Sequence, residues 1–202
     1  MQPLRRRAAG AVLIGAAFAA GGCIPLAATG IAVGTLAVLD RRTVGAQTED
    51  TEIEIRAANR MPDAIKGSSG VAITSYNRRV LLTGQVPDAT SKADAERAVR
   101  EVPGVREVFN ELEVTPRVGF STVANDSAIT ARVKAGFVEQ KALNANVVKV
   151  VTENGVVYLL GLVTQAEGPA YAGVASRMPG VRRVVTLFEF ITDEELARIN
   201  AR

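Results

Sequence analysis

An internal repeat is the feature that most limits what this chain of 202 residues can fold into. The segment VLLTGQVPDA, which begins at Val80, matches VYLLGLVTQA, which begins at Val157. Two shorter matches recur at a spacing of 76 positions: Pro-Gly-Val-Arg at 103–106 and 179–182, and Asp50-Thr51 with Asp126-Ser127. Each unit has about 65 residues, which suffices for a small domain with its own core. The repeat therefore predicts two tandem domains of one fold.

Each unit begins with a predicted helix and a hairpin. Asp50 and Asp126 are predicted as N-caps, because an aspartate side chain can accept hydrogen bonds from the free N–H groups of a first turn. In the second unit, β-branched runs at 148–152 and 156–163 flank Asn154-Gly155, a pair that favours a two-residue turn. The first unit has Asn77-Arg78 at this place, which is a weaker turn signal.

The rest of each unit reads as a second helix and a last strand. The second helices are predicted at 89–102 and 165–178, and each ends at a Pro-Gly pair. The last strands are predicted at 105–115 and 181–191. The order is therefore α-β-β-α-β, an α+β fold in which two helices pack on a three-stranded sheet. After the repeat, Thr192 and Glu195 predict a capping box that opens a short terminal helix.

The N-terminal segment is typical of an exported protein. Arg5, Arg6 and Arg7 precede an uncharged run from 8 to 20, and Gly21-Gly22 then leads to Cys23. A basic start, an apolar stretch and small residues describe a signal peptide, here residues 1–22. Cys23 is the single cysteine and resembles the lipobox cysteine of bacterial lipoproteins, which carries diacylglycerol, becomes the new N-terminus and is acylated.

Two other interpretations of this segment stay open. Residues 8–39 carry no charge and are long enough to span a bilayer as an uncleaved anchor. Cys23 would in that case be an ordinary small apolar residue. Under the lipoprotein interpretation, Ile24 rather than Asp after the cysteine implies sorting to the outer membrane, and residues 23–49 form the lipidated N-terminus and a tether.

Composition argues against several classes of function. The formal charge is +3, but the three arginines of the signal account for it, and the remainder has 21 basic and 21 acidic residues. This balance gives no support to nucleic-acid binding. With no His, one Cys and no phosphate-binding fingerprint, we expect no enzyme, no catalytic residues, no metal site, no cofactor and no small-molecule substrate.

The first helix of the second unit carries a candidate membrane surface. Its core face is predicted to hold Ile129, Val133 and Phe137. The opposite face combines small apolar residues with lysines, a pattern that suits contact with anionic phospholipid: Ala128, Ala131, Lys134, Ala135, Val138 and Lys141. Helix propensity alone, or packing against the first unit, would also explain the alanines.

The repeat resembles the BON domain, and the chain resembles dual BON-domain outer-membrane lipoproteins of the DolP/YraP type. The resemblance rests on these segments: Arg42-Thr43-Val44-Gly45, residues 80–86, Val108-Phe109-Asn110-Glu111, Asn125-Asp126, Thr152-Glu153-Asn154-Gly155, Gly161-Leu162-Val163-Thr164 and Ala175-Ser176-Arg177. It implies three-stranded mixed sheets, with BON domains at 50–116 and 126–191, a linker at 117–125 and a short terminal helix at 192–202. Pro62 within the predicted first helix departs from the pattern.

The resemblance also implies a function. It implies a lipid-anchored outer-membrane protein facing the periplasm, whose second BON domain binds anionic phospholipid, and which supports envelope integrity and is recruited to division sites. Better-known members carry a Trp where this chain has Ala128, so we expect weaker binding or more reliance on Val138 and the two lysines. The alternative is an adaptor that binds a protein of an envelope assembly complex.

Overall fold

The computed structural model describes residues 40–66, 70–140 and 142–201. Cys23, the signal peptide and the uncharged run at 8–39 therefore lie outside the described residues. The elements of the first unit are α2 (Val44–Arg60), α3 (Asp63–Lys66), β1 (Ala72–Tyr76), β2 (Arg79–Thr83), β3 (Gln85–Val86), α4 (Ala89–Arg100), β4 (Glu107–Asn110) and β5 (Glu113–Val114). Those of the second unit are α5 (Phe120–Glu139), β6 (Val148–Glu153), β7 (Val156–Val163), α6 (Glu167–Ser176) and β8 (Arg183–Phe190), and α7 (Asp193–Asn200) follows.

Each unit has the predicted order and a three-stranded mixed sheet. The middle strand, β2 or β7, is antiparallel to the strand before it in the chain and parallel to the last strand. In the first unit the predicted strand 105–115 is divided into β4 and β5, and β5 pairs with β3 in a separate two-stranded ribbon. Gly84 makes this division possible, because its φ of +109° turns the chain between β2 and β3.

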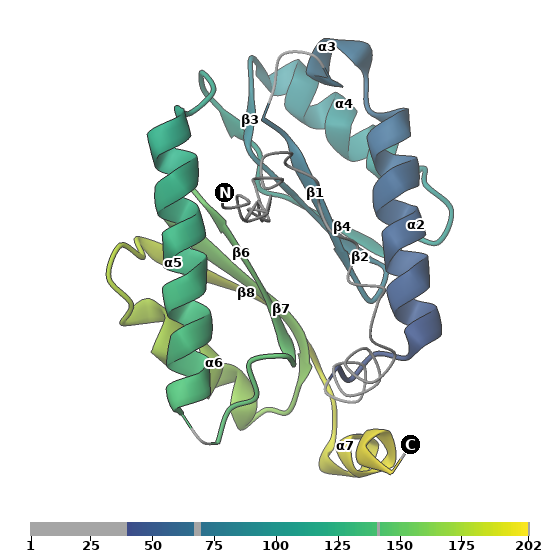
Figure 1. Ribbon diagram of the computed structural model, residues 1–202. Helices are drawn as coiled ribbons and strands as arrows, with labels where there is room; N and C mark the ends of the chain where they lie inside the picture. Colours follow the sequence, from purple (N-terminus) through teal and green to yellow (C-terminus); the bar gives the residue numbers. More distant parts are fainter. Residues whose placement is uncertain (1–39, 67–69, 141, 202) are drawn as a thin grey trace, which may run out of the picture.

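The two units pack through their sheets. Figure 1 shows α2 and α4 on one side, α5 and α6 on the other, and the two sheets facing each other between them. Along β7, Val157, Leu159 and Val163 belong to the core of the second unit, whereas Tyr158 and Leu160 belong to the core between the sheets. This alternation buries β7 on both faces, as expected for a strand between two apolar layers.

Two polar contacts between the units are related by the repeat. The side-chain amide of Asn77 donates to Glu189 at 2.7 Å, and that of Asn154 donates to Glu113 at 3.3 Å. These residues occupy equivalent positions of the repeat, so each unit offers its hairpin turn to the last strand of the other. Two copies of one surface meet in this way in a symmetric dimer.

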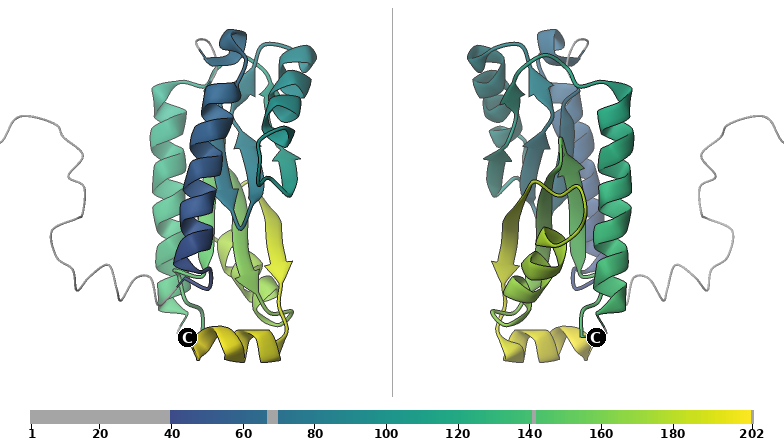
Figure 2. Two further views of the ribbon diagram at one scale, coloured as in Figure 1. Left: turned by 90° about the vertical axis from the view of Figure 1, so that its right-hand side faces the viewer. Right: turned by 90° about the vertical axis from the view of Figure 1, so that its left-hand side faces the viewer.

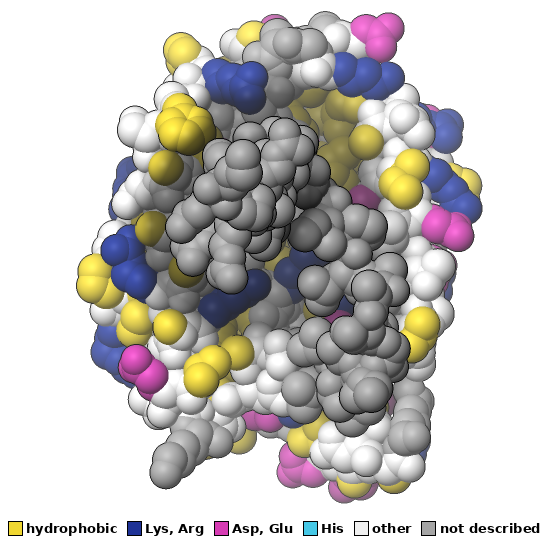
Figure 3. Space-filling view, viewed as in Figure 1, with side chains coloured by type: hydrophobic (Ala, Val, Ile, Leu, Met, Phe, Trp, Pro, Cys, Tyr) yellow, Lys and Arg dark blue, Asp and Glu magenta, His cyan; other side chains and the backbone are white. Residues whose placement is uncertain are grey.

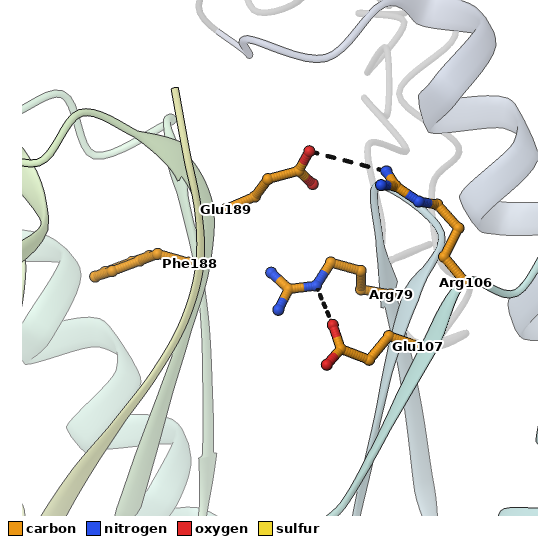
Figure 4. Close-up of a pocket in the computed structure, with 5 residues that line it drawn as sticks. All are labelled: Arg79, Arg106, Glu107, Phe188 and Glu189. Atoms are coloured by element: carbon orange, nitrogen blue, oxygen red, sulfur yellow. Dashed lines mark hydrogen bonds and ion pairs between the residues drawn. The ribbon is translucent and has the colours of Figure 1, made fainter. Parts of the chain in front are cut away.

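A cleft opens at one edge of this contact. It has a volume of about 450 Å³ and is lined by Arg79, Arg106, Glu107, Phe188 and Glu189 (Figure 4). Arg79 donates to Glu107 at 2.8 Å and to the carbonyl of Leu187 at 3.2 Å, and Arg106 lies 3.8 Å from Glu189. Arg79 and Glu107 thus pair within the first unit, and the pair of Arg106 with Glu189 and the hydrogen bond from Arg79 to Leu187 join the two units.

A buried carboxylate joins the first helix of each unit to the hairpin. Oδ1 of Asp50 accepts from the backbone N–H of Arg78 and from the hydroxyl of Ser75, both at 2.7 Å. Its Oδ2 accepts from the N–H of Asn77 and from the guanidinium of Arg42, again at 2.7 Å. In the second unit, Asp126 accepts from the N–H groups of the equivalent turn.

These contacts correct the predicted role of both aspartates. Asp50 and Asp126 lie inside α2 and α5 and are not N-caps; Thr43 caps α2 instead, and its side chain accepts from the N–H of Ala46 at 3.1 Å. The carboxylates serve the turns because both central residues there have positive φ, which points two N–H groups toward the helix. Both aspartates do accept backbone N–H groups, as predicted. These groups belong to the hairpin turn, however, and not to the first turn of the helix.

The structure also changes three predicted boundaries of the helices. Helix α5 begins at Phe120, so most of the predicted linker 117–125 is helical. Helix α2 begins at Val44, so the last residues of the predicted tether 23–49 belong to the fold. Pro62 lies after the end of α2 rather than within it, since Met61 closes that helix through an N–H bond to the carbonyl of Ala57.

The chain just before α2 is fastened to both units. Arg41 binds both carboxylate oxygens of Glu167 at 2.7 Å and the carbonyl of Leu162 at 2.8 Å, all in the second unit. Arg42 binds Asp50 of the first unit and lies 4.0 Å from the centre of the Tyr76 ring. The root of the tether therefore sits at the seam between the units, beside α7 (Figure 2).

Replacing Asp50 with Asn should destabilise the fold most at neutral pH. Burial opposes ionisation, but the hydrogen bonds from Arg78, Ser75, Asn77 and Arg42 outweigh it and lower the pKa of Asp50. The stability from this ionised group is present above the unfolded-state pKa of about 4 and is lost as the pH falls through the lower native pKa. We expect Asp50→Asn to cost about 2 kcal/mol at pH 7 and to weaken the acid sensitivity.

Urea unfolding at pH 7, 4.5 and 3 measures both effects. Asp63→Asn is the matched control, because the Asp63 side chain is 98% exposed. If Asp50→Asn unfolds at the same urea concentration as this control at pH 7, the carboxylate does not hold the turn.

Candidate functional site

Helix α5 is fixed to the second unit by one buried face. Ile129, Val133 and Phe137 are fully buried in the core that α5 shares with the sheet and α6. The rings of Phe137 and Tyr171 meet edge-on with centroids 5.0 Å apart. Because the rotation of the helix is fixed by these contacts, the direction of its opposite face is fixed as well.

The predicted surface residues lie on that opposite face. Ala128, Ala131, Lys134 and Ala135 are exposed, and Val138 is 69% exposed. Lys141 lies outside the described residues. Figure 3 shows hydrophobic and basic side chains gathered along α5 at the left of the view. Their contact with lipid stays a prediction.

Two large apolar residues of this surface were missed by the sequence reasoning. Phe120 is 87% exposed and Val123 is 51% exposed, both in the first turn of α5. At about 100° per residue, Phe120 and Val138 are separated by five full turns and point in the same direction. Both residues fall in the predicted linker 117–125, because Asp126 is predicted to begin the helix; the signal that could reveal them is the apolar pair itself. We call Phe120, Val123, Ala128, Ala131, Lys134, Ala135 and Val138 the α5 face.

The α5 face lacks acidic side chains. Arg132 and Lys134 are exposed on the same helix, and in the described part of the chain neither forms an ion pair. Glu139 is exposed directly after Val138, and it forms no ion pair in that part of the chain either. Two cations against one carboxylate leave a small positive excess beside the face, which attracts anionic groups within about a Debye length.

Helix α2 provides an internal comparison, because it holds the equivalent position in the first unit. Glu52 stands where α5 has Ala128, and it pairs with Arg56 at 2.7 Å on the surface. Asn59 stands where α5 has Ala135. At these two positions α5 has small apolar residues where α2 has charge or polarity. Helix α2 nevertheless also exposes apolar side chains, Val44 at the position of Phe120 and Ile55 at that of Ala131.

Comparison with known proteins agrees with the repeat. Two segments, residues 49–116 and 125–192, match the model of the BON domain. The chain belongs to the BON domain family. Both BON domains include the buried aspartate and the hairpin turn, so the interaction that organises each unit lies within the family's own fold.

Several relatives match over most of their length. Outer membrane lipoprotein DolP of Haemophilus influenzae is 39% identical over 193 residues, which cover 95% of this chain and 98% of that protein. The 21 kDa hemolysin of Actinobacillus pleuropneumoniae is 33% identical and covers 76% of this chain and 80% of its own. Osmotically-inducible protein Y of Escherichia coli is 30% identical, with coverage of 70% and 72%. The chain is thus a dual BON-domain protein of the DolP type, and this kinship points to a non-catalytic protein.

The assignment of the two faces of α5 can be tested by stability alone. Replacing Phe120 or Val138 with Ser should change the free energy of unfolding by less than about 0.5 kcal/mol, because both side chains are exposed. Val133→Ser should cost about 3 kcal/mol, since it leaves a cavity and buries a hydroxyl. Urea unfolding of the three variants measures these changes. A large loss of unfolding free energy in Val138→Ser would mean that this face of α5 packs against protein.

Proposed function

We propose that the chain is an outer-membrane lipoprotein facing the periplasm, in which the second BON domain binds anionic phospholipid through the α5 face and supports envelope integrity. We also propose that it is recruited to division sites, as the resemblance to DolP-type lipoproteins implies. The observation that carries the proposal is an exposed helix face that combines the large apolar residues Phe120, Val123 and Val138 with the unpaired Lys134.

The physical argument concerns what such a face gains at a bilayer. Phe120, Val123 and Val138 lose contact with water when they enter the headgroup boundary, which is worth about 25 cal/mol for each Å² of apolar surface. A Lys near an anionic surface adds about 1 kcal/mol. In water the same exposure brings no gain, so a neighbouring apolar phase accounts for the face better than solvent does.

Phe120 supplies the aromatic group that Ala128 does not. Aromatic side chains favour the membrane–water interface. The structure puts this ring at the first turn of α5, two helical turns before Ala128. In this chain, contact would therefore begin at the N-terminal end of α5 rather than at its middle.

Support for the anchor comes from the N-terminal sequence and from the relatives. A curated relative that matches nearly the whole chain is itself an outer membrane lipoprotein by name. In the described part of the chain, no helix combines the length and the apolar character that a membrane span needs. Two or more acyl chains on Cys23 would hold the protein at the membrane, whereas the α5 face alone would bind reversibly.

Vesicle binding tests the α5 face. The mature chain with Cys23→Ser should sediment with vesicles that contain phosphatidylglycerol and much less with phosphatidylcholine vesicles. Val138→Glu combined with Lys134→Glu should weaken this binding at least tenfold, because charge repulsion replaces apolar burial and attraction. Phe120→Ser should weaken it several-fold.

Ile55→Glu on α2 is the matched control, because Ile55 is 57% exposed at the position equivalent to Ala131. It should bind as the parent does. Equal binding to both kinds of vesicle, or no binding to either, contradicts the lipid role.

Mass spectrometry of the mature N-terminus tests the anchor. We expect a chain that begins at Cys23 and carries diacylglycerol and further acyl groups. An intact Met1 would instead establish residues 8–39 as an uncleaved segment, and Cys23→Ser would then leave the protein at the membrane.

A further inference from the structure

The C-terminal helix α7 buries none of its eight residues. A helix of this length is marginal in water unless it packs against something. Its capping box, in which the side chains of Thr192 and Glu195 each accept from the other's backbone N–H, stabilises the first turn. The remainder of the helix therefore needs an apolar contact for its stability.

The inner side of α7 borders a hollow. Leu196 and Ile199 are three residues apart and so lie on one side of the helix, and both are half-buried. The hollow has a volume of about 330 Å³ and is bounded by α7, the start of α2 and the second unit. Figure 2 shows α7 lying across the end of the molecule at which α2 begins. We call this space the α7 hollow, and its apolar lining residues are Ala46, Leu162, Ile191 and Ile199.

The charged groups around the α7 hollow are mostly satisfied within the chain. Arg41 and Arg42 each bind carboxylates at 2.7 Å. Glu189 accepts a hydrogen bond at 2.7 Å, and Glu195 belongs to the capping box. In the described part of the chain, Arg198 is the one charged lining residue without a partner, and it is exposed to water. The apolar lining therefore favours an uncharged, apolar occupant.

The uncharged N-terminal segment leads directly to this hollow. Asp40 is the first described residue, and the three residues that follow it line the hollow. Four uncharged residues precede Asp40, and three of them are large and apolar: Leu36, Ala37, Val38 and Leu39. An extended chain advances about 3.5 Å per residue, so all four are within about 14 Å of Asp40. A segment that is already attached at the edge of the hollow does not lose the translational freedom that a separate partner would lose on binding.

We propose that residues 36–39 dock in the α7 hollow, and that α7 covers them against the wall formed by Leu162 and Ile191. Docking removes apolar surface of the segment and of α7 from water at the same time. It gives α7 the packing that its contacts with the described residues do not supply. The occupant is thus a part of the same chain, and the site is separate from the α5 face.

A docked segment shortens the free part of the tether. This consequence, unlike the docking, rests on the proposed lipid anchor at Cys23. The free tether then comprises residues 24–35 instead of 24–39, and its greatest span falls from about 55 Å to about 40 Å. Helix α7 would in this way limit how far the two BON domains move from the anchored residue.

Amide hydrogen exchange tests the docking in the mature chain with Cys23→Ser, which carries no lipid. The triple variant Leu36→Ser, Val38→Ser and Leu39→Ser should raise the exchange rates of the amides of residues 196–200 about tenfold, because α7 loses its packing. A second triple variant, Leu26→Ser, Ile31→Ser and Val33→Ser, removes similar side chains farther from Asp40. It should leave these rates as they are in the parent.

Thiol labelling tests the same contact from the segment. The Cys23→Ser chain has no other cysteine, so Val38→Cys and Val33→Cys each introduce a single thiol. The thiol at position 38 should react with N-ethylmaleimide about tenfold more slowly than that at position 33, because docking covers it. Ile199→Ser should remove this difference, whereas Ala197→Ser, at an exposed position of α7, should keep it.

Either of two results overturns the proposal: unchanged exchange of α7 in the first triple variant, or equal reactivity of the two thiols. Protection of α7 that weakens on dilution assigns the hollow to a segment of a second copy, and overturns docking within one chain. Vesicle binding enters none of these measurements, so a failure of the docking and a failure of the lipid role are distinguishable.

Discussion

A carboxylate buried between a helix and a hairpin turn is the interaction on which the rest of this structure depends. The turn points two N–H groups away from water, and the carboxylate accepts hydrogen bonds from both. It occupies the same position on the first helix of each unit. Together with the apolar contacts of the core, this bond fixes the rotation of α2 and α5 about their axes. The rotation in turn decides which residues of each helix enter the core and which face outward.

Much of the fold could be predicted from the spacing of apolar residues and from the residues that form turns and end helices. The repeat, the Asn-Gly turn and the Pro-Gly stops give the element order, and apolar spacing gives the core face of α5. The start of α5 could not be predicted in the same way, because an aspartate suits both an N-cap and a buried turn-binding position: in each it accepts backbone N–H groups, of its own helix in one case and of the hairpin turn in the other. That single ambiguity removed Phe120 and Val123 from the predicted surface.

The contacts between the units were beyond the reach of sequence reasoning for a different reason. Tyr158 and Leu160 alternate with Leu159 and Val163 along β7, so the strand reads simply as continuously apolar. A run that is buried on both faces does not say what covers each face. The answer, a second copy of the same sheet, follows only once two units with the same exposed sheet face are placed in one chain.

The two units of the repeat have diverged on both their inner and their outer surfaces. Where the second unit gives Leu160, Leu162 and Leu187 to the core between the sheets, the first unit has Thr83, Gln85 and Glu111. Helices α2 and α5 also differ along their outer faces. Duplication followed by such divergence lets one unit keep the stability of the pair while the other acquires surfaces for new contacts.

The position of Arg41 and Arg42 at the seam has a mechanical consequence. A force applied through residue 40 reaches Glu167 in one unit and Asp50 in the other at the same time. The load is therefore divided between Glu167 on α6 and Asp50 within α2, so part of it bypasses the N-terminal turn of α2. A pull on the N-terminal side of residue 40 would have to break contacts with both units before α2 could unwind.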